Sequence, residues 1–141
     1  MPVGNLGPDD VVTATRETKL EEITETLDSE SVGAIVITED ESPVGIITDR
    51  DAALAIHQHD DVGSVSVEEV MTEDPATIQE NEEAIEMSRA IKEHNVRRFP
   101  VVDENDTLTG IVTLDDLVAT IGEQLENVSK TIETQSPEYS P

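Results

Sequence analysis

The sequence predicts an α+β fold in which one β-α-β-β-α unit occurs twice, with the two copies packed through their sheets about a pseudo-twofold axis. Residues 32–51 and residues 96–116 both show an apolar run, an acidic turn, a second apolar run and a helix start. An apolar stripe with helical spacing precedes each of these stretches. A pattern that recurs in this way indicates one supersecondary unit used twice.

The first copy is predicted at residues 10–61, after an irregular segment at residues 1–9 that is rich in turn residues. A short strand is expected at the start of this copy. Apolar periodicity and turn residues then place the remaining elements in this order: a helix at Thr18–Asp28, strands at Val32–Thr38 and Val44–Ile47, and a helix that begins at Thr48.

The second copy is predicted at residues 70–125, after a connector at residues 62–69. From Glu126 onward the pattern fades, so we expect a disordered tail at residues 126–141. The elements of the second copy repeat the order of the first: a lead-in strand at Pro75–Ile78, a helix at Glu82–His94, strands through Phe99–Val102 and Ile111–Val112, and a helix at Leu114–Leu125.

The composition is strongly acidic, with 33 Asp and Glu residues against 8 Lys and Arg residues and a formal net charge of −25. The long periodic apolar runs indicate a folded core, so we expect an acidic surface suited to high salt and a halophilic source. This charge argues against nucleic acid or an anionic membrane as a partner. Without cysteines, a signal peptide or a membrane-spanning apolar run, a cytoplasmic protein is expected.

Each copy carries a Thr-x-x-Asp motif shortly after a glycine, as Thr48 to Asp51 and as Thr113 to Asp116. Such a motif caps a helix, because the threonine hydroxyl accepts a hydrogen bond from the third amide and the helix dipole favours an early carboxylate. A carboxylate at this position would also lie at the mouth of the sheet and could accept hydrogen bonds from a ribose diol. Capping and ligand binding are compatible, and we expect both.

Over residues 6–125 the double unit resembles a tandem pair of cystathionine-β-synthase (CBS) domains, also called a Bateman module. The resemblance rests on the paired Gly-h-h-Thr-x-x-Asp segments, on Met71-Thr72 with Pro75–Ile78, and on Val96–Val102. It implies a regulatory module that needs no obligatory cofactor and binds an adenosyl ligand in clefts between the repeats. The implied ligands are AMP, ADP, ATP and S-adenosylmethionine.

The resemblance also implies two symmetry-related sites that use elements of both repeats. The first site would comprise Asp116 for the ribose, Thr113 beside it, Arg97 and Arg98 for phosphate, and the facing residues Val12, Val32 and Gly33. The second site would comprise Asp51 and Thr48, with Ala76, Thr77 and Val96 as an apolar wall for the base.

The arginine pair makes the two sites unequal. Where the second copy has Arg97–Arg98, the first has Gly33–Ala34, which carries no charge. The arginines could simply pair with nearby carboxylates. Their position beside a Thr-x-x-Asp segment instead favours a phosphate clamp. We therefore expect the phosphate at the Asp116 site, and an adenosyl ligand without that charge at the Asp51 site.

The sequence thus predicts a regulatory module that signals ligand occupancy to a partner protein whose identity it does not give. The alternative is a structural or dimerisation module with empty clefts. A nucleotide-acting enzyme ranks last, since the spacing places no base, nucleophile or metal ligand set. The apolar residues Leu117, Val118 and Ile121 exceed what one cleft needs, and together with the resemblance they predict a homodimer.

Overall fold

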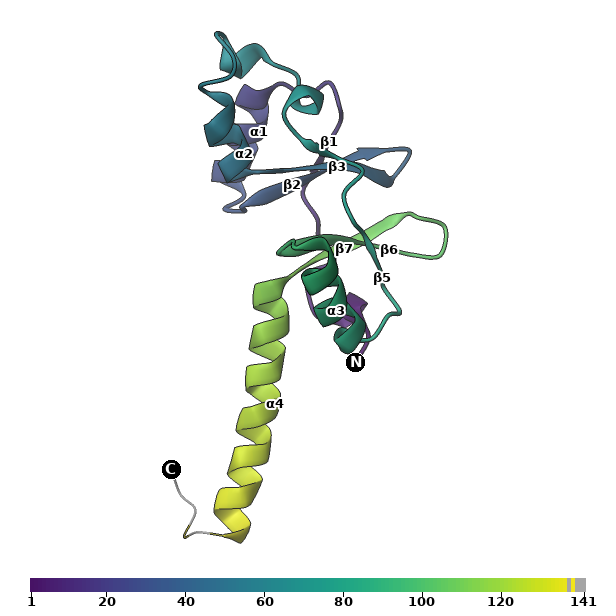
Figure 1. Ribbon diagram of the computed structural model, residues 1–141, viewed down its shortest axis with the longest axis vertical. Coiled ribbons are helices and arrows are strands. Elements are labelled where there is room, and N and C mark those ends of the chain that lie inside the picture. Colours follow the sequence, from purple (N-terminus) through teal and green to yellow (C-terminus); the bar gives the residue numbers. More distant parts are fainter. Residues whose placement is uncertain (137, 139–141) are drawn as a thin grey trace.

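A computed structural model of the chain describes residues 1–136 and residue 138. Two α+β halves meet through their sheets at the centre of the molecule, the helices lie on the outer sides, and one long helix, α4, projects away from the body (Figure 1). The first half contains a four-stranded sheet of order β1-β2-β3-β4, and the second a three-stranded sheet of order β5-β6-β7. The predicted α+β class with two copies of one unit is confirmed.

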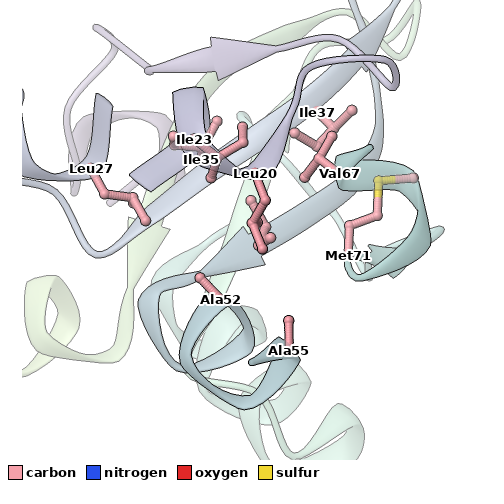
Figure 2. Packing of buried hydrophobic residues seen from close by; sticks show 10 residues of the cluster. Leu20, Ile23, Leu27, Ile35, Ile37, Ala52, Ala55, Val67 and Met71 are labelled. Atoms are coloured by element: carbon pink, nitrogen blue, oxygen red, sulfur yellow. The ribbon is translucent and has the colours of Figure 1, made fainter. Parts of the chain in front are cut away.

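The first half forms around an amphipathic helix that covers its sheet. Strand β1 runs parallel to β2, and β2 to β4 are antiparallel neighbours. Leu20, Ile23 and Leu27 recur at i, i+3 and i+7 on the helix and are buried against the strands, as Figure 2 shows. The elements are β1 (Thr13–Ala14), α1 (Leu20–Ser29), β2 (Ala34–Glu39), β3 (Ser42–Thr48), α2 (Asp49–Ala55) and β4 (Thr72–Glu73).

The second half repeats this arrangement. Strand β5 runs parallel to β6, and β6 is antiparallel to β7. Met87, Phe99 and Val112 are fully buried in its core. The elements are β5 (Ile78–Gln79), α3 (Ala84–His94), β6 (Arg98–Val102), β7 (Leu108–Thr113) and α4 (Leu114–Gln135). Short 3-10 helices also lie at Val3–Asn5 (η1), Val62–Ser64 (η2) and Val67–Glu69 (η3).

Strand register supports the predicted pseudo-twofold relation. Ala34 pairs with Thr48 in the first hairpin, and Arg98 pairs with Thr113 in the second. The third residue before each of these strands has the same left-handed conformation, since Ser31 and Asn95 both have φ of 54°. Counting from these pairs, Gly33–Ala34 corresponds to Arg97–Arg98. The backbone therefore matches at positions where the side chains differ in charge.

The segments that precede each repeat pack onto the other repeat, and this corrects the expectations of an irregular segment at residues 1–9 and of a second copy that begins at residue 70. Residues 1–9 were expected to be irregular, yet Val3 is fully buried in the second core and its amide donates to the Glu82 carbonyl at 2.7 Å. The connector likewise buries Val67 in the first core. Met71 joins that core as well, and it fills the space where a Cβ on Gly45 would lie 2.3 Å from its sulfur.

The expected disordered tail is wrong as far as Gln135, because α4 continues to that residue. The rest of the expected tail includes residues 137 and 139–141, which lie outside the described residues. Within the part of the chain that the structure describes, no helix combines the length and apolar content required to cross a bilayer.

Candidate ligand clefts between the repeats

The two Thr-x-x-Asp motifs form capping boxes of matching geometry. The Thr48 hydroxyl accepts the Asp51 amide at 3.1 Å, and Asp51 Oδ2 accepts the Thr48 amide at 3.0 Å. The corresponding distances at Thr113 and Asp116 are 3.2 and 2.9 Å. The predicted capping role is confirmed at both motifs. Each carboxylate is held by its own backbone, and these bonds use only one of its two oxygens.

A cavity of about 440 Å³ lies beside the first motif, and we call it the larger cleft. It combines the Thr48 to Asp51 segment of the first repeat with the lead-in and β6 start of the second. Its lining residues are Ile46, Thr48, Asp49, Arg50, Asp51, Thr72, Pro75, Ala76, Asn95, Val96, Arg97 and Arg98. The predicted Asp51, Thr48, Ala76 and Val96 therefore come together here, whereas Thr77 is not part of the lining.

A cavity of about 200 Å³ lies beside the second motif, and we call it the smaller cleft. Its apolar wall comes from the first repeat and its lead-in segment. The lining residues are Pro8, Asp10, Val11, Val12, Val32, Gly33, Ala34, Arg98, Ile111 and Thr113. The predicted Val12, Val32, Gly33 and Thr113 come together here, whereas Asp116 does not line the cavity.

The N-terminal segment explains why the second cleft is smaller. The Ile111 amide donates to the Pro8 carbonyl at 3.3 Å, so this segment runs along the edge of β7. At Gly7 an added Cβ would lie 2.3 Å from the Ile111 carbonyl oxygen and 3.0 Å from Asp116 Oδ2. Only glycine permits this approach without a backbone shift. The segment therefore lies over the carboxylate expected to bind ribose.

The expected placement of the arginine pair is wrong for Arg97. Its side chain lines the larger cleft with Asp51, not the smaller one. Arg97 lies immediately before β6, and it shares the larger cleft with residues of the first repeat such as Asp51. The Arg97 guanidinium also lies 3.7 Å from Asp115 Oδ1 on an exposed surface. Arg97 thus has a carboxylate partner and also lines a cleft, so the structure agrees in part with each of the two interpretations of this residue.

Arg98 lines both clefts. Its Nη1 donates a long hydrogen bond of 3.4 Å to the Gly33 carbonyl, in the wall of the smaller cleft. The Arg98 guanidinium thus lies where the two cavities approach each other. If this side chain moves toward one cleft, its positive charge moves away from the other cleft.

Positive charge is concentrated at the larger cleft. Arg50, Arg97 and Arg98 line it, which is three of the chain's 8 basic residues. Among the described residues that line the smaller cleft, one is basic, Arg98, and one is acidic, Asp10. The larger cleft therefore carries more positive charge on its lining than the smaller one, although Asp49 and Asp51 offset part of it.

Sequence reasoning missed Arg50 as a lining residue of the larger cleft and the lead-in residues Asp10, Val11 and Pro75. In the sequence Arg50 lies between Asp49 and Asp51, so its charge is locally balanced and gives no signal of a cleft residue. The lead-in residues carry a signal in hindsight, because Pro75 and Val11 occupy corresponding positions ahead of β5 and β1. The sequence alone does not place these residues in the clefts, because their position depends on how each lead-in segment packs against the other repeat.

A family model for the CBS domain matches residues 3–58 and again residues 67–123. The chain belongs to the CBS domain family. The two matches coincide with the two repeats, so the protein is a tandem CBS pair, as its sequence motifs predicted.

Similar proteins support the same assignment. An uncharacterized protein of Methanopyrus kandleri is 31% identical over 139 residues, which cover 92% of this chain and 71% of that protein. The CBS domain-containing protein YhcV of Bacillus subtilis is 32% identical over 125 residues, or 84% of this chain and 89% of that protein. Among solved structures, the CBS domain pair of protein MJ0100 in complex with 5'-methylthioadenosine and S-adenosyl-L-methionine has a TM-score of 0.78 and 26% identity, covering 88% of this chain and 98% of that one.

Proposed function

We propose that this CBS pair is a regulatory module, not an enzyme, that binds a phosphate-bearing adenosyl ligand such as AMP, ADP or ATP in the larger cleft and signals its occupancy to a partner protein. The observation that carries the proposal is the convergence of Arg97 and Arg98 with Asp51 on one cavity. The similar CBS pair solved with two adenosyl ligands supports the ligand class.

The larger cleft offers a suitable group for each part of such a ligand. Asp51 keeps one carboxylate oxygen outside its capping bonds, and that oxygen can accept a ribose hydroxyl. Pro75, Ala76 and Val96 provide apolar surface for a base. The guanidinium groups can donate charge-assisted hydrogen bonds to phosphate oxygens. The cavity volume of about 440 Å³ falls within the range of small-molecule sites, roughly 300–1,000 Å³.

The smaller cleft suits an adenosyl ligand without phosphate charge. Gly33 and Ala34 stand where the larger cleft has its arginines, and the volume of about 200 Å³ lies below the usual range for ligand sites, roughly 300–1,000 Å³. Binding there would require the segment around Gly7 to move from its contact with Asp116. We therefore expect weaker binding at this site, with S-adenosylmethionine as a candidate.

Signalling would operate by population shift between two packings of the repeats. A ligand in the larger cleft contacts both repeats, so it binds more tightly to the packing that brings Asp51 and the arginines to the best separation. A partner that recognises one packing then responds to the ligand. The coupling can be no larger than the ligand's difference in affinity for the two packings.

Calorimetric titration with AMP tests the proposal, using Asp51→Ala and the matched Asp116→Ala. Asp51→Ala should cost about 1–3 kcal/mol of AMP binding free energy, because ribose hydroxyls lose their acceptor. Asp116→Ala should leave AMP binding nearly unchanged, although it removes an equivalent capping group. Equal losses in the two variants would contradict the assignment of AMP to the larger cleft. No binding of AMP, ATP, adenosine or S-adenosylmethionine to the wild type would favour a structural or dimerisation module.

A further inference from the structure

Helix α4 carries an apolar stripe that nothing in the described chain covers. Its N-terminal turns pack on the body through Leu117, but every described residue from Ile121 to Gln135 except Ser129 is exposed. Figure 1 shows this part extending away from both repeats. The stripe comprises Val118, Ile121, Leu125, Val128 and Ile132, which are 46–65% exposed.

The spacing of this stripe is that of a coiled coil. Successive members of the stripe are separated alternately by three and four residues, which is the a and d pattern of a heptad repeat. A stripe with this period stays on one side of a helix that winds around a neighbour. From Val118 to Ile132 it spans roughly 21 Å at about 1.5 Å per residue.

The helix has little reason to persist alone. Gly122 lies in its middle, and β-branched residues are frequent on either side. Both types lower helix propensity. Most helical stability in proteins comes from packing of an apolar face, and no residue among 1–136 covers this face. A partner that buries the stripe would supply the missing stabilisation.

The residues that flank the stripe indicate what that partner is. The e and g positions between Ile121 and Ile132 hold Gly122, Gln124, Ser129 and Thr131, none of which is charged. The charged residues of this part, Glu123, Glu126, Lys130 and Glu133, all fall on the b and f positions of the outer face. In a chain with 33 acidic residues among 141, this distribution leaves the flanks free of like charge.

Neutral flanks suit a second copy of the same helix. Acidic e and g positions would repel their own copies across the seam, whereas neutral ones do not. A basic partner would gain from acidic flanks, and an anionic membrane would be repelled by the outer glutamates. The pairing surface is therefore compatible with itself and offers no charge to attract a different partner.

We propose that α4 pairs side by side with α4 of a second copy of this chain, burying Val118, Ile121, Leu125, Val128 and Ile132 in a coiled-coil seam. The CBS family match ends at residue 123, while the helix continues to Gln135. Much of the seam therefore lies beyond the family's domain and is a feature of this chain. Such pairing would hold two CBS pairs together without using either cleft.

The test combines light scattering with amide hydrogen exchange on the full chain. The wild type should have twice its 15.3 kDa chain mass at micromolar concentration, with protected amides at residues 123–135. Leu125→Glu places a charge in the seam and should lower the protection of those amides by at least about tenfold, because burial of a leucine side chain is lost. Val128→Glu provides a second seam variant with the same expected result.

Asn127→Glu is the matched control, because it adds the same charge to the same helix turn on the outer face. Exchange in the body should be unchanged in all three variants, which shows that the repeats remain folded. A monomeric wild type would overturn the proposal. So would equal protection of residues 123–135 in Leu125→Glu and Asn127→Glu. Since no ligand is present, failure here leaves the proposed function of the clefts untouched.

Discussion

The two clefts share one backbone plan and differ in the side chains placed on it. Their capping boxes agree within 0.1 Å at each hydrogen bond, so a carboxylate is presented in the same way twice. The opposite walls carry Arg97–Arg98 in one case and Gly33–Ala34 in the other. In a duplicated fold, the position of a ligand group can be fixed by the repeat while its charge preference is set by two residues.

Removal of an arginine from the larger cleft should cause the largest change in AMP binding. Arg98→Ala should weaken AMP binding by about 1.5–3 kcal/mol, because a charge-assisted hydrogen bond to phosphate is lost. Adenosine, which has no phosphate, should lose little. Calorimetric titration of both ligands measures the difference.

Arg89→Ala is the control for overall charge. It removes an arginine that pairs with Glu86 on α3, away from both clefts. The clamp assignment is wrong if Arg98→Ala weakens AMP and adenosine equally, or if the control weakens AMP as much.

The two caps should respond alike to loss of their threonines. Thr48→Ala and Thr113→Ala should each reduce the free energy of unfolding by about 1 kcal/mol, since each removes the acceptor for one helix-start amide. Urea denaturation measures both. A difference of more than about 1 kcal/mol between the variants would show that the matching geometry conceals unequal stabilities.

An arginine added to the smaller cleft should make the two clefts more alike in charge. Among these variants it should have the smallest effect on AMP binding. Gly33→Arg places an arginine at the counterpart of Arg97, and an added Cβ there meets neighbours only at 3.8 Å or more. We expect AMP binding at the smaller cleft to improve by about 0.5–1 kcal/mol, because an exposed charge is well screened.

Asp51→Ala supplies the background for that measurement, since it weakens the larger cleft. Gly33→Gln on the same background separates charge from side-chain size. Equal AMP binding by the arginine and glutamine variants would rule out charge as the difference between the clefts.

The fold could be predicted from the sequence, and ten of the twelve predicted site residues line one of the two clefts, because these features depend on local patterns. Thr48 and Thr113 can be recognised as caps from a few neighbouring residues, and apolar periodicity defines the helices. The cleft that Arg97 lines could not be predicted, since it depends on how the two repeats pack against each other. Val3 was missed for a related reason, because its burial depends on a repeat that begins some seventy residues later.

The end of α4 was missed for a different reason. From Glu126 onward the apolar pattern fades, and this fading predicted a disordered tail. The heptad spacing through Val128 and Ile132 was nevertheless present in the sequence. A helix stabilised by a partner need not show strong propensity of its own, so periodicity was the better guide here.

The crossing of each lead-in segment onto the opposite repeat makes the two halves interdependent during folding. A polypeptide ending before Val67 would lack a residue of the first core as well as strand β4, and one starting after Val3 would lack part of the second core. Neither repeat is therefore a complete folding unit, and the pair should unfold in one cooperative transition. The same crossings act as tethers, so a change in the spacing of the repeats must displace backbone on both sides at once.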